Sequence, residues 1–321
     1  MERRQIFAAS AAVLGTALAA PRMVLAQAPA AQAPGFYRLK VGSQTATIVH
    51  DGFNRAPNIT NGFVRNATPE AVTTALRDAF LAPPALDIPF SITFLETPTG
   101  LVVFDTGTGG QLGSPNAGLI TANMRAAGID PAAVTRVVIS HFHGDHITGL
   151  TNADNSAVFP NAQVLVPEAE WAFWMDDATM GRAPEAMRGA FANVRRRFGP
   201  YAAKTERFAA GAEVAPGVRA IATPGHTPGH TSFIVADGSD SLVILGDVTN
   251  HPAINLANPG WHIGFDMDAT MAEATRRRLF DQVATDRTRC VGYHFPFPAN
   301  GYIVKTADGY RLVPATWSSA G

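Results

Sequence analysis

Cysteine is almost absent from this sequence: Cys290 is the only one in 321 residues, so no disulfide can form within one chain. Charge is nearly balanced, and a formal net charge of −1 gives no electrostatic reason to expect a nucleic-acid partner. The Ala-rich stretch that ends at Ala20 is short for a membrane span and contains Ser10, Gly15 and Thr16, so we expect no stable insertion into a membrane. The composition is 46% hydrophobic, which is enough for the core of a globular protein.

The N-terminal segment has the features of an export signal. Arg3 and Arg4 precede a mildly apolar stretch, and small residues before Gln27 offer a cleavage site, so residues 1–26 resemble a twin-arginine signal. Residues 27–35 are rich in Ala, Pro and Gln and are predicted to form a spacer. We therefore expect a periplasmic or secreted protein in which residues 36–321 form a single domain.

Residues 141–146 read His-Phe-His-Gly-Asp-His and place four potential metal ligands in six positions. The β-branched run 134–140 before them predicts a buried strand, and Gly144 lets the chain turn so that side chains on both sides of it can converge. Imidazole together with carboxylate favours Zn, Mn, Fe, Co or Ni over Ca or Mg. The alternative is a solvated loop with chance histidines, which this density of ligands disfavours.

Three further candidate ligands follow in order: His226 in Thr-Pro-Gly-His, Asp247 in Gly-Asp and the distal His294. With the Asp-Thr-Gly at 105–107, this series of motifs resembles the metallo-β-lactamase superfamily of dinuclear hydrolases. The resemblance implies a mixed α/β (α+β) fold, the four-layer αββα metallo-β-lactamase sandwich, with the metals at one edge between the sheets. It also implies the ligand roles: His141, His143 and His226 would hold one metal, Asp145, His146 and His294 the other, and Asp247 would bridge both.

The remaining histidines match no ligand position of that superfamily. His230 is expected to pack in the core or to hydrogen-bond a ligand and fix its tautomer. His50, His251 and His262 are expected at the surface or at the rim of the pocket. Cys290 is interpreted as a packed core thiol.

The implied cofactors are two divalent metal ions, with Zn²⁺ as first choice and Mn, Co, Fe or Ni as alternatives. Metal binding lowers the pKa of water from about 15.7 toward ~7, so a metal-bridging hydroxide would attack an ester, a lactone or a phosphotriester. Asp145 and Asp247 are the expected catalytic residues. Asp247 would hold both metals, and Asp145 would orient the hydroxide or take its proton.

Two alternatives lie outside hydrolysis. A mononuclear iron oxygenase of the persulfide dioxygenase kind uses the same fold but needs only three protein ligands, so the full set of seven disfavours it. A non-catalytic metal-binding protein would usually close its site with four ligands that include cysteine. The superfamily resemblance instead implies that Asp247 is shared by two metals, which leaves room at the site for a bridging hydroxide.

The segments 246–247, 265–268, 276–278 and 294–298 resemble the methyl parathion hydrolase-like branch, which is close to the quorum-quenching lactonases. That branch implies an exported, often dimeric enzyme acting on phosphotriesters, lactones or aryl esters, so we expect a small apolar ester or lactone substrate and a homodimer. Leu112 stands where we expect an aromatic pocket wall in organophosphate hydrolases, which disfavours phosphotriesters. Other candidates for the wall are Trp171, Trp174, Phe191 and Phe265, although core packing accounts better for the Trp pair.

Apolar patterns and turn residues predict the order of the elements. A hairpin over 36–40 and 45–49 is followed by a helix that opens at Thr68-Pro69. The triple arginines at 195–197 and 276–278 are interpreted as solvated helix faces. Further strands are expected near 89–96, 101–105, 163–166, 218–222, 231–235 and 241–246 and in a segment ending at His294, and further helices near 117–127, 167–176, 184–198 and 269–284.

Overall fold

The computed structural model describes residues 33–319. The predicted export signal, residues 1–26, and most of the predicted spacer, residues 27–35, lie outside the described residues. From Pro34 onward the chain forms one unit. Within the described range, every helix is too short or too polar to cross a bilayer.

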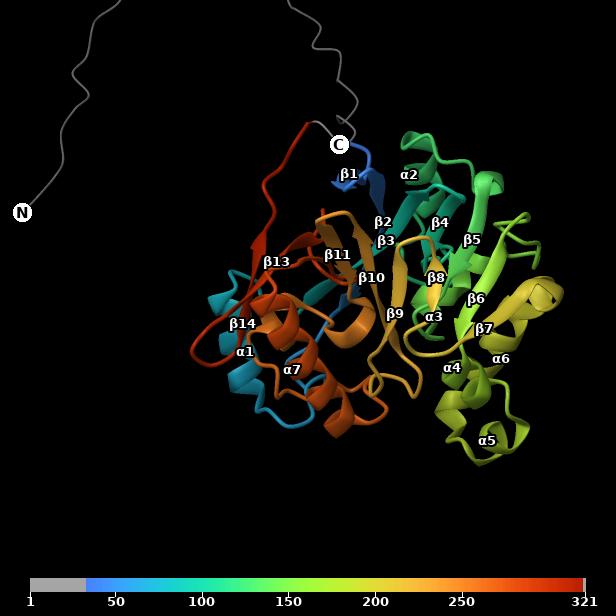
Figure 1. Ribbon diagram of the computed structural model, residues 1–321. Coiled ribbons are helices and arrows are strands. Elements are labelled where there is room, and N and C mark those ends of the chain that lie inside the picture. Colours follow the sequence, from blue (N-terminus) through green and yellow to red (C-terminus); the bar gives the residue numbers. More distant parts are fainter. Residues whose placement is uncertain (1–32, 320–321) are drawn as a thin grey trace, which may run out of the picture. The chain divides into compact units, whose positions relative to one another are not determined.

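The first half of the chain builds a sheet of seven strands that lie side by side in sequence order (Figure 1). The strands are β1 (Phe36–Val41), β2 (Gln44–Ala56), β3 (Leu86–Thr97), β4 (Gly100–Phe104), β5 (Val134–Val138), β6 (Gln163–Pro167) and β7 (Thr205–Phe208). The predicted hairpin is confirmed, since Val41 pairs with Gln44 across a two-residue turn. Strands β1 to β4 are antiparallel and β4 to β7 are parallel, so β4, β5 and β6 end at the same edge of the sheet.

The second half builds another sheet of seven strands, in the order β14-β13-β12-β11-β10-β9-β8. They are β8 (Glu213–Ala215), β9 (Val218–Ala222), β10 (Thr231–Asp237), β11 (Asp240–Ile244), β12 (Arg289–Val291), β13 (Asn300–Lys305) and β14 (Tyr310–Pro314). Only β11 and β12 are parallel, so these two strands also end together. The prediction of a strand ending at His294 is wrong in its end point. Strand β12 stops at Val291, because Gly292 donates a backbone hydrogen bond to Ala299 and closes a loop.

Helices cover the outer faces of the two sheets, except for the four-residue helix α3, which lies in the segment of predicted ligands after β5. They are α1 (Pro69–Asp78), α2 (Ile120–Ala126), α3 (Gly144–Ile147), α4 (Glu168–Trp174), α5 (Asp177–Arg182), α6 (Glu185–Phe198) and α7 (Ala269–Thr285). Helix α1 begins as predicted, because Thr68 Oγ1 accepts the Ala71 N–H at 3.2 Å and caps it. Helix α2 starts at Ile120, three residues later than predicted, because the chain before it stays irregular.

Two cores lie on the two faces of the first sheet. Along β4, Val102 and Phe104 point into the core between the sheets, where Phe104 meets Phe233 of β10 with ring centroids 5.2 Å apart. Val103 points the other way, into a core shared with Phe191 of α6. This alternation produces helix, sheet, sheet and helix layers, which confirms the αββα sandwich.

The prediction that both triple arginines form solvated helix faces is wrong at one residue in each. Arg197 is 3% exposed and donates hydrogen bonds to Gln111, Thr151 and Asn193. Arg276 is fully buried and ion-paired to Asp266 at 3.1 Å. A run of like charges does not show which member turns inward. Most of the acceptors that make the burial tolerable lie outside the helix that carries the arginine, Gln111 and Thr151 for Arg197 and Asp266 for Arg276.

Truncating the inter-sheet contact tests this layer order. Phe233→Ala should lower the free energy of unfolding by about 3–5 kcal/mol, since it leaves a cavity between the sheets. Phe80→Ala is the matched control: Phe80 is 98% exposed, and its loss should change stability by less than about 0.5 kcal/mol. Urea unfolding of both variants at equal metal content measures the difference. Equal effects would contradict the assignment of Phe233 to the core.

Candidate metal centre

The ligand residues stand on loops and short helical turns at one edge of the two sheets, with Asp145 and His146 in α3. His141 to His146 follow β5, His226 lies between β9 and β10, Asp247 follows β11, and His294 follows β12. Each loop leaves a strand at this edge, so the fold brings together segments that are far apart in sequence. A hydrogen bond of 3.0 Å from the Thr231 N–H to the Ser140 carbonyl joins the two halves beside the site.

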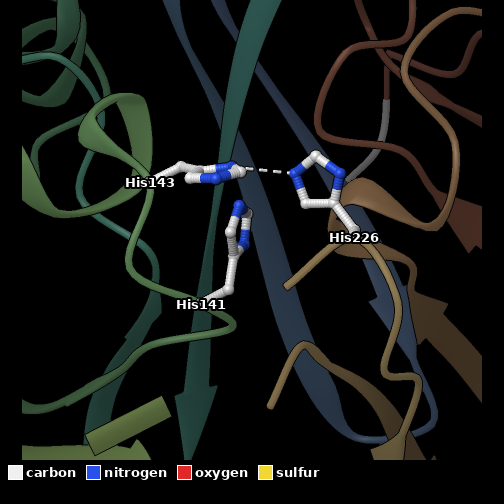
Figure 2. A group of neighbouring side chains, drawn as sticks. All are labelled: His141, His143 and His226. Carbon is white, nitrogen blue, oxygen red and sulfur yellow. Dashed lines mark hydrogen bonds between the residues drawn. The ribbon is translucent and has the colours of Figure 1, made fainter. Parts of the chain in front are cut away.

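The first ligand group is His141, His143 and His226. One ring nitrogen of each lies within 4.8 Å of the others, and Figure 2 shows the three rings turned toward one another. His143 Nδ1 and His226 Nε2 are 2.9 Å apart. The structure thus brings together the three residues that the superfamily resemblance assigned to one metal.

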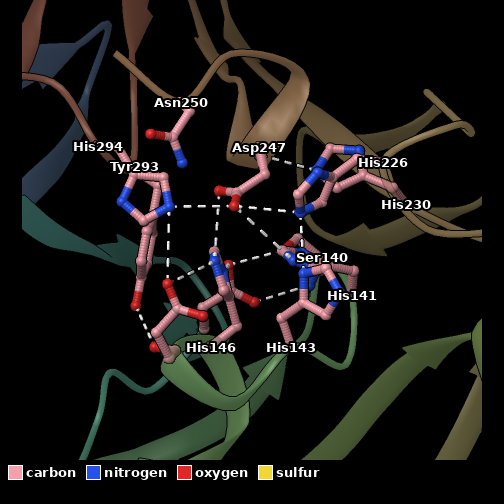
Figure 3. Close-up of polar contacts among 12 residues, drawn as sticks. Ser140, His141, His143, His146, His226, His230, Asp247, Asn250, Tyr293 and His294 are labelled. Atoms are coloured by element: carbon pink, nitrogen blue, oxygen red, sulfur yellow. Dashed lines mark hydrogen bonds and ion pairs between the residues drawn. The ribbon is translucent and has the colours of Figure 1, made fainter. Parts of the chain in front are cut away.

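The second ligand group is Asp145, His146, Asp247 and His294 (Figure 3). Asp145 Oδ2 lies 3.6 Å from His146 Nε2 and 3.6 Å from His294 Nε2. Asp247 Oδ2 lies 3.0 Å from His294 Nε2. All seven predicted ligands therefore fall into two adjacent groups.

Asp247 lies between the groups and contacts both. Its Oδ2 is 3.3 Å from His226 Nε2 and 3.9 Å from His141 Nε2, while its Oδ1 is 3.3 Å from His146 Nε2. Three of these buried atoms, His141 Nε2, His146 Nε2 and Asp247 Oδ1, make no hydrogen bond. Buried nitrogen and carboxylate atoms without hydrogen bonds, aimed at a common space, are the environment that divalent transition metals satisfy. The residues present fit two such ions.

A further set of acceptors fixes the orientation of the histidine rings. Asp105 Oδ2 lies 2.8 Å from His146 Nδ1, and Asp266 Oδ1 lies 2.9 Å from His226 Nδ1. The Pro89 carbonyl lies 2.8 Å from His294 Nδ1. With Nδ1 occupied in this way, Nε2 of each ring faces the centre. The roles of Asp105 and Asp266 were not predicted from the sequence, although both stand in segments that carry the superfamily resemblance.

His230 supports the centre without belonging to either ligand group, as predicted. Its Nε2 accepts the backbone N–H of Asp247 at 2.8 Å, and its Nδ1 lies 2.8 Å from Thr223 Oγ1. Burial lowers the pKa of His230 to about 3, which keeps the ring neutral and able to accept. The imidazole thereby fixes the backbone of the residue that links the groups.

The expectation for His251 is wrong. This ring is buried and its Nδ1 accepts the Ala253 N–H at 3.2 Å, so it caps the turn of residues 252–256 instead of lying at the surface. His50 and His262 are partly exposed, and neither lines the pocket. Cys290 is fully buried and burial raises its pKa to about 12, in agreement with a packed thiol.

Carboxylates control the charge of the centre. Burial lowers the pKa of His226, but hydrogen bonds to Asp247 and Asp266 outweigh it and raise the pKa to about 9. Burial raises the pKa of Asp247, but His294 and His146 outweigh it and hold that pKa well below the ordinary value. The ionised carboxylates attract positive charge, supplied by protons on the rings or by metal ions that displace those protons.

Glu170 ties the two loops that carry the first group, a role that sequence analysis missed. This buried carboxylate accepts the Phe142 N–H at 3.0 Å and the Gly229 N–H at 2.7 Å. It also accepts the indole N–H of Trp174 at 2.8 Å. Because Phe142 stands between two ligands and Gly229 lies in the loop that begins with His226, Glu170 fixes the spacing of these loops.

A pocket of about 340 Å³ opens over the centre. Its walls include Ile88, Phe90, Leu112 and Phe265, so they are largely apolar away from the ligands. Of the wall candidates named from the sequence, Leu112 and Phe265 line this pocket, whereas Trp171, Trp174 and Phe191 do not and pack into the core beneath α6. Helical spacing placed the two tryptophans on one face but not on the side that faces the pocket.

The metallo-beta-lactamase superfamily model matches residues 89–294, a span that holds all seven ligands. The chain belongs to the metallo-beta-lactamase superfamily. It is 24% identical over 250 residues to an N-acyl homoserine lactonase of a Bacillus species, a match that covers 71% of this chain and 87% of that protein.

Solved structures agree with this assignment. AidC, a dizinc quorum-quenching lactonase in complex with a product, is 26% identical with a TM-score of 0.83, covering 89% of this chain and 99% of that one. The hydrolase AbOPH of the beta lactamase superfamily has the same fold, with a TM-score of 0.85 at 24% identity over 90% of this chain and all of that one. Together with the two ligand groups, these relatives identify the protein as a metal-dependent hydrolase.

Neutralising a carboxylate that hydrogen-bonds one ligand histidine should lower the metal affinity of that ligand group and leave the affinity of the other group unchanged. Asp266→Asn takes a carboxylate from His226 and should lower metal affinity of the first group about 10–100-fold, and Asp105→Asn should do the same to the second through His146. Competition titration with a metal-binding dye reports both affinities. Loss of both metals in either variant, with the fold retained by circular dichroism, would contradict this separation.

Proposed function

We propose that the protein is a dinuclear metal-dependent hydrolase that opens a lactone carrying an apolar acyl group. The observation that carries the proposal is that one carboxylate, Asp247, contacts two ligand groups at the base of a pocket with apolar walls. Support comes from the relatives, several of which are N-acyl homoserine lactonases. Zn²⁺ is the proposed metal, because the AidC relative is a dizinc enzyme.

Two bound divalent ions would supply a nucleophilic hydroxide at neutral pH and stabilise negative charge on the substrate oxygen. The residues that would hold them are the two groups described above, with Asp247 common to both. The chain itself supplies the arrangement: neutral His230 fixes the backbone of Asp247, and Asp105 and Asp266 fix two of the rings.

Asp145 is the proposed proton acceptor on the protein. Its side chain is 23% exposed to the pocket, against 4% for Asp247, so it is the more accessible of the two carboxylates. The Tyr293 hydroxyl donates to the Asp145 carbonyl at 2.6 Å and holds its backbone, while the carboxylate belongs to the second ligand group and also lines the pocket. This placement suits a group that orients a nucleophile or receives its proton.

The pocket wall favours a lactone or ester over a phosphotriester. Leu112 is 46% exposed and lines the pocket, so an aliphatic side chain stands where we expect an aromatic wall in an organophosphate hydrolase. Phe265, 57% exposed, contacts Phe63 edge-on with ring centroids 5.7 Å apart and supplies an apolar surface at the same opening. An acyl chain or an alkyl ester group matches such walls.

Asp247→Ala should reduce the metal content from two ions to one per chain and lower hydrolysis at least about 100-fold, because the two groups lose their shared ligand. Metal analysis and turnover of an acyl-homoserine lactone, an aryl ester and a phosphotriester measure both effects. Asp154→Asn, an exposed carboxylate remote from the pocket residues, is the control and should change neither. Full activity with two metals in the Asp247 variant would refute the bridging role. One iron and no hydrolysis in the wild type would indicate an oxygenase instead.

We also propose that the protein is exported through a twin-arginine route, on the strength of Arg3, Arg4 and the apolar stretch after them. Replacing both arginines by lysine should retain the unprocessed chain in the cytoplasm, because that route recognises the arginine pair. Fractionation followed by mass determination of the N-terminus checks the result. Processed periplasmic protein from the lysine variant would argue against this route.

The proposed homodimer is tested by sedimentation of the mature chain.

A further inference from the structure

One long irregular segment forms the side of the pocket opposite the second sheet's loops. Residues 107–119, here named the wall loop, connect β4 to α2 and contribute Thr108, Leu112 and Ser114 to the pocket lining. The loop contains no helix or strand of its own, apart from one isolated bridge between Ala117 and Gly52. A segment of this length without regular structure depends on side-chain and loop contacts for its position.

Asp51 of β2 holds both ends of the wall loop. At the start of the loop, Asp51 Oδ2 accepts the Thr108 N–H and the Thr108 hydroxyl, each at 2.7 Å. At the other end, Asp51 Oδ1 accepts the Ile120 N–H at 2.9 Å, the first residue of α2. The Asp51 carbonyl also accepts the Gly118 N–H at 2.9 Å. Asp51 therefore joins the two ends of the loop, whereas Gln111 in its middle is held separately by Arg197 and the Thr151 carbonyl.

Hydrogen-bond donors and two glycines next to Asp51 accommodate its buried carboxylate. Asp51 is fully buried, so its oxygens need these donors to offset the loss of water. A Cβ on Gly107 would lie 2.7 Å from Asp51 Oδ2, and Gly107 has a φ of +76°, so a larger residue there would displace the contact. Next to Asp51, Gly52 allows β2 to approach the loop, since a Cβ there would lie 1.9 Å from the Asn116 carbonyl.

We propose that Asp51 is a positioning residue that sets the pocket wall and thereby the binding of the apolar part of the substrate. It acts through the wall loop. Among residues 33–319, its side chain accepts hydrogen bonds from the wall loop and from the start of α2, and from no member of either ligand group. Loss of the contact should let Leu112 move away from its place over the centre while the metal ligands stay in position. The proposal rests on the proposed lactone hydrolysis for its kinetic consequence, but not for its structural one.

Asp51→Asn is the sharpest test, because it keeps the size of the side chain and removes one of the two acceptor oxygens. Hydrogen exchange in peptides covering residues 107–120 should become at least about tenfold faster. For a lactone with a decanoyl chain, KM should rise about tenfold with kcat within twofold, and KM for a short-chain lactone should change less. Metal content should stay at the wild-type value.

Asp237→Asn is the matched control. Asp237 Oδ2 accepts the N–H and the hydroxyl of a single residue, Ser43, at 2.7 and 2.5 Å, as Asp51 does with Thr108, but Asp237 is partly exposed and does not line the pocket. This variant should leave loop exchange and KM unchanged. If Asp51→Asn does not fold, Thr108→Val, which removes one donor, should give a smaller increase in exchange of the same peptides.

The outcomes are distinguishable. Unchanged exchange of residues 107–120 in Asp51→Asn would overturn the proposal, and so would loss of a metal, which would mean that Asp51 acts on the ligands. Faster exchange with an equal rise in KM for short and long lactones would overturn the link to the apolar part of the substrate. If the wild type opens no lactone, the proposed function fails, while the exchange result still decides the role of Asp51 in the loop.

Discussion

The carboxylate of Asp247 is the interaction on which the rest of the centre depends. It contacts His146, His226 and His294, which follow three different strands, at 3.0 to 3.3 Å. Its own backbone is fixed by His230, whose low pKa keeps it an acceptor. A single buried charge thus brings two halves of the chain to one point. Its removal would take away the one carboxylate that contacts both ligand groups, and Asp105, Asp145 and Asp266 would remain beside single rings or one group only.

Outer carboxylates make this concentration of buried histidines tolerable. Asp105 contacts Nδ1 of His146, and Asp266 contacts Nδ1 of His226. Arg276 forms an ion pair with Asp266. The same negative charges that raise the pKa of His226 to about 9 favour a divalent ion once that ring is deprotonated. Protons and metals therefore compete for one set of sites. Metal occupancy should be coupled to proton release, and the energetic cost of burying the carboxylates is offset in either state.

The ligands could be predicted from the sequence because they are dense and local: four fall in residues 141–146, directly after a β-branched strand. The short edge strands β7 and β8 could not, since three or four residues are too few for a period of two to show. Glu170, Asp266 and Asp51 were missed for another reason. The role of a buried carboxylate depends on the donors it faces, and the backbone donors to Glu170 and the donors to the Asp51 side chain lie 28 to 69 residues away. The burial of Arg197 and Arg276 was missed because most of their acceptors lie outside the helices that carry them.

The structure separates the parts that hold metals from the parts that contact the substrate. The ligand loops are fixed by Glu170, His230 and Asp105, all buried and joined to backbone or ring atoms near the ligands. The two ends of the wall loop are held by Asp51 of β2, and its Gln111 by Arg197 of α6, neither of which belongs to a ligand group. Changes in the wall loop can therefore alter the pocket without disturbing the chemistry beneath it. In a superfamily whose fold serves many reactions, such independence explains how one metal centre accommodates different substrates.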